Sequence, residues 1–261
     1  MTLDFQWSPG LVLRVRYRRH VREEGMRPGR AITGRSFTWS VDDVGDGVLR
    51  LRPDDVHVLS PQDDRPALPH RRHLDALIDA PPDLRVSTSG TLLGLHDPAA
   101  IAASADISTA TLRALPADAR RLIAGMAHPD SLRALAEDLW SSLVSQWIAL
   151  GTVPTEPRSE TVSGQLPVLG TPARFVVTRT AEPLDDGTRL VCTTEVLQAD
   201  VQAALAARPT PVQGMVVESR ITLETDPATL VPRVLEVRRL QQVSVAEQVG
   251  SQLDVRTWEF R

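Results

Sequence analysis

Two histidines stand at a spacing that could bind a metal ion. His70 and His73 form a His-x-x-His pair, which places both imidazoles on one side of a helical turn, with Asp75 and the Asp63–Asp64 pair close in sequence. Imidazole nitrogens and carboxylate oxygens bind zinc, but this spacing fixes no third ligand. We therefore expect neither a metal nor a cofactor here.

Arginines recur at alternate positions. Arg14, Arg16 and Arg18 share one parity, and Arg50 and Arg52 extend the pattern. Such side chains line one face of a strand, and arginine is a preferred partner of carboxylate and phosphate. Two interpretations stay open: an anionic partner docks on this face, or the arginines pair with acidic residues of neighbouring strands. With 33 acidic residues in the chain, we favour the cross-strand pairs.

An apolar stripe that carries two tryptophans could line a pocket. Leu139, Trp140, Leu143 and Trp147 recur at helical spacing, while Trp39 alternates with polar residues in a strand-like segment. Most such stripes are core, but incomplete packing between a helix and a curved sheet would leave a hydrophobic pocket. We take these five residues as the candidate ligand-binding site.

Missing residue types exclude whole mechanisms. All 29 basic Lys+Arg positions are arginine, and the chain has neither lysine nor asparagine, which rules out Schiff-base chemistry, a Walker A loop and a Cys-His-Asn triad. The hydrolase elbow, zinc-protease and dinucleotide motifs do not occur either. Because no nucleophile, base and orienting group can be assembled from spacing, we expect a protein that is not an enzyme.

Charge and composition limit the classes of partner that the protein could bind. A formal charge of -4 and 4% aromatic residues disfavour nucleic-acid binding. Cys192, the single cysteine, cannot form an internal disulfide, and its strand-like segment predicts a buried thiol. No stretch is long and apolar enough to span a membrane, and residues 1–7 lack a signal peptide, so we expect a cytoplasmic protein as written, or a periplasmic or envelope protein if a signal was removed.

The period of the apolar residues divides the chain into three segments. Residues 1–96 alternate with a period of two, with a hairpin turn at 42–47, and residues 59–83 read as a loop with one short helical possibility at 70–78. Within residues 97–150, apolar spacing and capping residues predict helices at 108–115 and at 116–127. The strongest predicted helix runs from 130 to a C-terminal cap at Gly151. Alternation returns over 151–261, interrupted by a short helix at 200–207.

This order predicts an α+β fold in a single domain, 1–261. We expect one large, curved, half-barrel-like antiparallel sheet built from both terminal segments, with the helices of 97–150 packed on its concave face. The alternative is two small α+β domains divided near residue 150.

The order of elements, with a late strand-turn-strand from Leu223-Glu224-Thr225-Asp226-Pro227 to Arg233-Val234-Leu235, resembles the lipoprotein-carrier family of bacterial envelopes and envelope proteins of similar plan. Members of that family are curved half-barrels lidded by helices. The resemblance implies non-catalytic binding of an acyl chain or another apolar ligand between sheet and helices. The alternative is a structural or protein-protein interaction module with a filled core, and the oligomeric state stays open.

Overall fold

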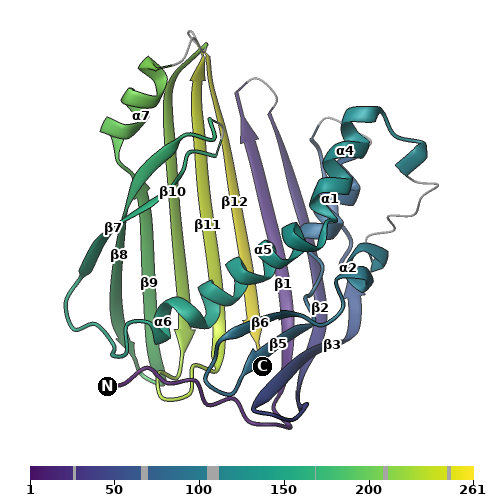
Figure 1. Ribbon diagram of the computed structural model, residues 1–261, viewed down its shortest axis with the longest axis vertical. Helices are drawn as coiled ribbons and strands as arrows, with labels where there is room; N and C mark the ends of the chain where they lie inside the picture. The colour runs from purple at the N-terminus through teal and green to yellow at the C-terminus, as the bar shows by residue number, and fades with distance from the viewer. Residues whose placement is uncertain (26–27, 66–69, 105–111, 168, 208–210, 246–247) are drawn as a thin grey trace.

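The structure, a computed structural model, describes residues 1–261 except 26–27, 66–69, 105–111, 168, 208–210 and 246–247. Its central feature is one open antiparallel sheet of twelve strands (Figure 1). The strands are β1 (Val12–Glu24), β2 (Gly29–Asp43), β3 (Val48–Val58), β4 (Gln62–Asp63), β5 (Leu84–Ser87), β6 (Leu92–Leu95), β7 (Arg158–Gln165), β8 (Pro172–Leu184), β9 (Gly187–Val196), β10 (Val212–Thr225), β11 (Pro232–Val245) and β12 (Gln248–Phe260).

The first long strand pairs with the last one. The order across the sheet is β6-β5-β3-β2-β1-β12-β11-β10-β9-β8-β7, and β4 pairs with β2. Between β1 and β12 the register runs from Val15 opposite Phe260 to Glu24 opposite Ser251. The strands of 1–96 and of 151–261 therefore belong to one sheet, which confirms the predicted fold class.

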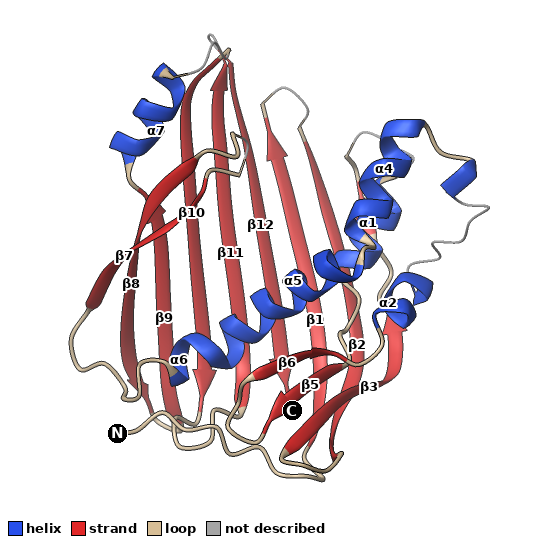
Figure 2. Ribbon diagram, in the orientation of Figure 1, coloured by secondary structure: helices blue, strands red, loops and turns tan. Residues whose placement is uncertain are grey.

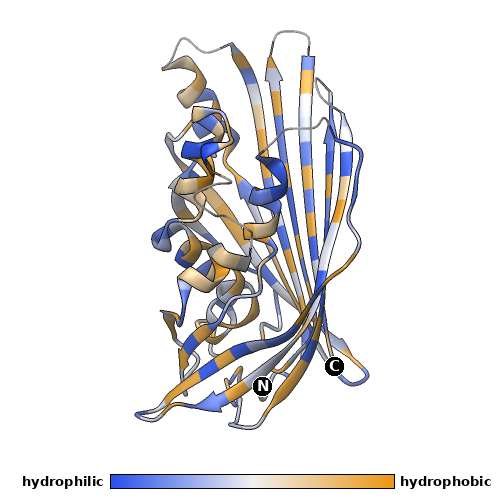
Figure 3. Cartoon of the chain, turned by 90° about the vertical axis from the view of Figure 1, so that its right-hand side faces the viewer, coloured by the Kyte–Doolittle hydropathy of each residue, from blue (hydrophilic) through white to orange (hydrophobic). Residues whose placement is uncertain are grey.

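The alternation in β1 explains why one face of the sheet is buried and the other is exposed to solvent. Leu13, Val15, Tyr17, Arg19 and Val21 are buried, while the residues that alternate with them are exposed. A strand with period two presents one face to the core and the other to water, as antiparallel sheets commonly do. The helices lie on the buried face, and in Figure 3 they are all on one side of the sheet.

The helices are α1 (Arg71–Ile78), α2 (Pro98–Ser104), α4 (Ala117–Met126), α5 (Pro129–Trp140), the π-helical segment η1 (Ser141–Ser145), α6 (Gln146–Ile148) and α7 (Gln198–Ala206) (Figure 2). The helices expected at 116–127 and 200–207 are confirmed as α4 and α7. Residues 59–83 are not simply a loop, since they contain β4 and α1, and the helix expected at 108–115 lies largely outside the described residues.

The strongest predicted helix is present but is not a regular α-helix throughout. It begins at Pro129, with His128 as its N-cap, and ends before Gly151, whose φ of 68° is the left-handed conformation expected of a C-terminal glycine. Between its two α-helical parts, η1 widens the turn. The Ser142 hydroxyl donates to the Asp138 carbonyl there, a side-chain bond of the kind that disturbs a regular helix.

The α5–η1–α6 segment crosses the inner face of the sheet and covers the largest hydrophobic cluster (Figure 1). A second cluster lies under α7, against β8 to β10, and a third joins α1, α2 and α5. Within the described part of the chain, no helix is both long enough and apolar enough to cross a membrane.

Candidate functional site

The structure brings the five predicted ligand-binding residues into one cluster. Trp39 of β2 and Trp140, Leu143 and Trp147 of the covering segment are at most 1% exposed, and Leu139 packs against them. Their indole groups are also satisfied: Trp39 donates to the Pro82 carbonyl at 3.2 Å, Trp140 to Gly90 at 2.8 Å and Trp147 to Ser142 at 2.8 Å. These residues therefore lie in packed core, and only Leu139 borders an open space.

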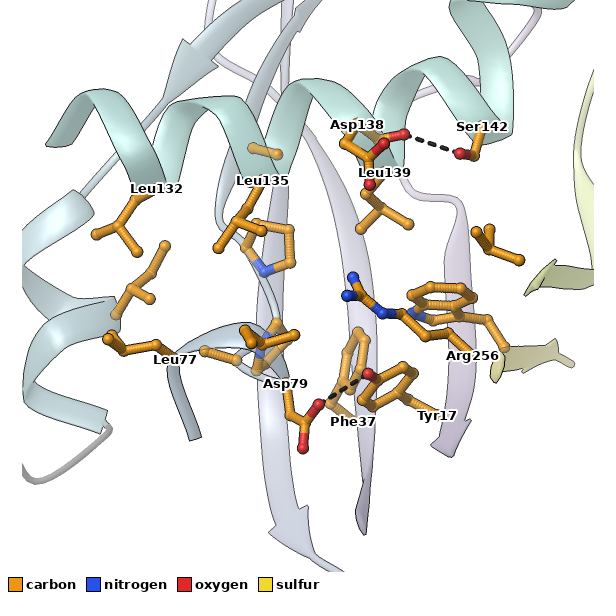
Figure 4. Close-up of a pocket in the computed structure, with 18 residues that line it drawn as sticks. Tyr17, Phe37, Leu77, Asp79, Leu132, Leu135, Asp138, Leu139, Ser142 and Arg256 are labelled. Atoms are coloured by element: carbon orange, nitrogen blue, oxygen red, sulfur yellow. Dashed lines mark hydrogen bonds between the residues drawn. The ribbon is translucent and has the colours of Figure 1, made fainter. Parts of the chain in front are cut away.

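That space is a small cavity beneath α5. Figure 4 shows Leu135 and Leu139 pointing from α5 toward Asp79 and Arg256 across it. Its volume is about 50 Å³, whereas pockets for small molecules measure roughly 300–1,000 Å³. The cavity has room for ordered water and not for an acyl chain.

A larger cleft lies close to this cavity, and Asp79 lines both spaces. Its volume is about 410 Å³, and we call it the α1 cleft. It is lined by Gly34 and Arg35 of β2, Leu59 and Pro61 after β3, and Arg72 and Ala76 of α1. The cleft thus lies between sheet and helix, as the sequence predicted for a binding site, but none of the five predicted ligand-binding residues lines it. Asp63 and Asp75, which the sequence indicated only as possible metal ligands, do line it.

Arg35 is the most unusual residue of this cleft. It is 6% exposed, and among the described residues it forms no ion pair and one side-chain hydrogen bond, from Nη2 to the Ala76 carbonyl at 3.2 Å. Burial lowers the pKa of Arg35, although Asp79 acts in the opposite direction. A buried guanidinium with most of its five donors unused is a ready partner for an anion.

A network of ion pairs joins α1 to the sheet, and its members Asp63, Arg65 and Asp75 line the α1 cleft. Arg19 of β1 contacts Asp75 of α1 at 2.8 Å and Asp254 of β12 at 3.0 Å. Arg65 contacts the same Asp75 at 2.6 Å and Asp63 at 2.7 Å. Asp79 also lies 3.9 Å from Arg19, so Arg19 contacts three carboxylates and Arg65 contacts two, which fixes α1 to the sheet at a defined position.

The carboxyl groups of this network differ in their proton affinity. Burial opposes ionisation of Asp254, but Arg19 and Arg256 outweigh it and hold the pKa of Asp254 below its ordinary value. For Asp79 burial dominates and raises the pKa. Burial and the nearby Asp79 also raise the pKa of Tyr17, whose hydroxyl donates to Asp79 at 2.8 Å (Figure 4).

One sequence signal could have indicated this network. Arg19 has the same parity as Leu13, Val15, Tyr17 and Val21, so an arginine occupies an inward position of an otherwise apolar face. A charge at a core position needs partners, because an unpaired buried charge is very costly. Its partners on α1 could not be named, since that segment was interpreted as a loop.

The remaining candidates are structural. Of the two histidines considered as ligands, His73 is buried in α1 and His70 precedes the helix as its N-cap. Among the described residues no three His, Cys, Asp or Glu side chains are grouped so that they could hold a metal ion. Cys192 is buried on β9 as predicted, and burial raises the pKa of its thiol.

A second cleft, of about 420 Å³, also borders Arg35, near β3 and α2. Its charged walls are already paired within the chain: Arg50 contacts Asp83 at 2.7 Å, and Arg52 contacts Asp54 at 3.1 Å. Both clefts share Arg35, but the wall of the α1 cleft is the more apolar, so the α1 cleft is the better candidate site.

The fold is an open antiparallel half-barrel with helices on its inner face. No protein-family model matches the chain, and no curated protein sequence matches it, so the resemblance to lipoprotein carriers depends on the order of elements. A solved structure described as "Lipid-protein interactions in lipovitellin" aligns with 98% of the chain at 10% identity and a TM-score of 0.49. The chain spans 25% of the length of that lipovitellin chain.

Proposed function

We propose that the protein is a non-catalytic binding protein for a small amphipathic anion, such as a carboxylate with an alkyl chain, and that the ligand lies in the α1 cleft. The observation that carries this proposal is Arg35, a buried arginine without an ion pair among the described residues, on the wall of a cleft of about 410 Å³. This site replaces the tryptophan stripe as the place of binding.

The chemistry of the walls supports an amphipathic ligand. Leu59, Pro61 and Ala76 offer apolar surface to an alkyl chain, while Arg35 and the exposed Arg72 favour an acid group at one end. The carboxylates of Asp63 and Asp75 do not compete for Arg35, because Arg65 binds both of them. Ligand sites of this kind are mostly apolar, with a few polar groups that fix orientation.

Two experiments test the proposal. Native mass spectrometry of protein purified without detergent reveals any ligand that is retained. Calorimetric titration with decanoate and with its uncharged match, methyl decanoate, then measures affinity. We expect decanoate to bind more tightly, and Arg35→Gln to weaken its binding about 10- to 100-fold, the loss of a charge-assisted hydrogen bond.

Two further variants keep the test decisive if Arg35→Gln is poorly folded. Leu59→Trp fills the α1 cleft and is expected to abolish binding. Arg52→Gln, which changes a residue of the neighbouring cleft only, is expected to leave it unchanged. A parent protein that binds neither compound would overturn the proposal and favour the interaction module with a filled core. Loss of binding in Arg52→Gln, with Leu59→Trp unaffected, would move the site to the neighbouring cleft.

A further inference from the structure

The outer face of β1 carries a row of exposed arginines that the α1 cleft does not use. Arg14, Arg16 and Arg18 are all exposed, and they alternate with the buried residues of β1, so they lie on the face of the sheet that is turned away from the core. The helices lie on the other face (Figure 3). Consecutive members of the row are about 6.8 Å apart along the strand. Their neighbours on β2 are Thr38, Ser36 and Gly34, none of which is acidic. On β12, Glu259 lies opposite Arg16 in the register, but its ion pair is with Arg261.

The row lacks the cross-strand pairs that the sequence favoured. Arg50 and Arg52 do pair with acidic residues: Arg52 contacts Asp42 on β2 and Asp54 on its own strand, and Arg50 contacts Asp83, which precedes β5. With the residues that the structure describes, Arg14, Arg16 and Arg18 form no ion pair. Surface arginines are usually explained by neighbouring carboxylates, so three unpaired ones in register leave a local positive field on a chain whose net charge is -4.

Two further observations show what this face could contact. Arg14 and Arg16 line, together with Arg261, an open depression of about 520 Å³, which Asp55 and Glu259 also border; Glu259 lies 3.8 Å from Arg261. Farther along, the half-buried Val255 and Leu253 of β12 lie beside β1 on the same face. Arginines therefore border partly exposed aliphatic side chains.

We propose that the outer face of β1 docks on an anionic membrane surface, with Arg14, Arg16 and Arg18 contacting acidic lipid headgroups. Charge complementarity argues for an anionic partner, and the broad outer sheet face suits a surface whose headgroups can rearrange around it better than a partner of fixed shape. Each arginine near such a surface strengthens binding about 5-fold, and salt weakens the attraction.

Vesicle co-sedimentation tests this proposal. Vesicles of phosphatidylcholine are compared with vesicles that contain phosphatidylglycerol as well, at low and at physiological salt. The parent is expected to bind the anionic vesicles only, and the triple variant Arg14→Gln/Arg16→Gln/Arg18→Gln is expected to bind about 100-fold more weakly. The matched control Arg113→Gln/Arg120→Gln/Arg121→Gln removes the same charge on the helical side and is expected to stay within about 3-fold of the parent.

The thermal midpoint of each variant shows whether it is folded, and the single variant Arg16→Gln, expected to lose about 5-fold, replaces the triple one if that is unstable. Equal losses in the two triple variants would overturn the proposal, because net charge alone would then explain binding. The proposal would also be overturned if the parent protein did not bind the anionic vesicles but did bind polyglutamate, a result that would favour an acidic protein partner. Neither result depends on whether the α1 cleft binds decanoate.

Discussion

The Tyr17 hydroxyl on β1 donates a hydrogen bond of 2.8 Å to Asp79, the residue that ends α1. Both residues are buried, and this bond, together with the Arg19 ion pairs, holds α1 against the inner face of the sheet. The α1 cleft therefore depends on the polar contacts beneath it, and changes there should be measurable without any knowledge of the ligand.

Replacing Tyr17 by Phe should destabilise the protein by about 1 to 3 kcal/mol, because a buried carboxyl loses its donor while the ring is retained. The ring contact with Trp258, at 4.9 Å between centroids, stays possible. Chemical denaturation of the two single variants Tyr17→Phe and Asp79→Asn and of the double variant gives the coupling energy. A coupling energy of zero would show that the two groups do not interact.

The two buried carboxyl groups should respond to pH in opposite directions. Asp79 has a raised pKa, so its contribution to stability is complete below the ordinary aspartate value of about 3.9 and is lost as the pH rises through the raised pKa. Asp254 has a lowered pKa, so its contribution is present above the ordinary value and is lost as the pH falls through the lowered one.

The measurement is the free energy of unfolding of the parent relative to each Asn variant. Relative to Asp79→Asn, the parent should gain stability as the pH is lowered from 7 toward 4. Relative to Asp254→Asn, it should show no change in that range and should lose stability below it. The same slope for both variants would contradict the assigned environments.

Replacing Trp147 by Ala should cost about 3 to 5 kcal/mol through lost contacts and an unfilled void. Trp147 has no exposed surface, and its indole donates to Ser142. Leu122→Ala on α4 is the control, since Leu122 is 47% exposed and its loss should change stability by less than about 0.5 kcal/mol. A small effect of Trp147→Ala, together with binding of an acyl probe by the parent, would return the site to the tryptophan stripe.

Gly90→Ala should be more harmful than Gly45→Ala, although both glycines have a φ near +85°. The strained backbone costs each variant about 1 to 2 kcal/mol. A Cβ on Gly90 would also lie 2.6 Å from Ile148 Cδ1 and 2.9 Å from the Phe5 ring, which adds about 1 to 3 kcal/mol, whereas the Cβ of residue 45 meets open space. Thermal melts of the two variants separate the clash from the strain.

The sequence was most informative where one period of apolar residues persists. Long runs in which apolar and polar residues alternate predicted β1 to β3 and β8 to β12. The pattern arises because an antiparallel sheet with one solvent-exposed face needs apolar side chains on the other face only. The sequence was less informative for residues 59–83, which are rich in proline and charge: the expected loop is wrong, whereas the short helical possibility at 70–78 corresponds to α1. The π-helical turn at Ser141–Ser145 also has no counterpart in the spacing, since Trp140 and Trp147 fit an ordinary helix equally well.

The location of open space could not be predicted from the sequence. The tryptophan stripe is found where it was expected, but whether it surrounds a pocket depends on how side chains from β2, β10, β11 and the helices fill one volume. The α1 cleft is likewise formed by residues such as Gly34 and Ala76, which carry no chemical signal of their own. Arg35 becomes unusual only when its burial is known.

The pairing of β1 with β12 sets the order in which this chain can fold during synthesis. When β1 leaves the ribosome, β2 can pair with one of its edges, but the partner of the other edge is encoded in the last residues of the chain, where Phe260 lies opposite Val15. The nascent chain therefore carries an unpaired strand edge until β12 has been synthesised. We infer that the two halves of the sheet join only once β12 has left the ribosome, and that in the meantime this edge of β1 is exposed to aggregation and to chaperones.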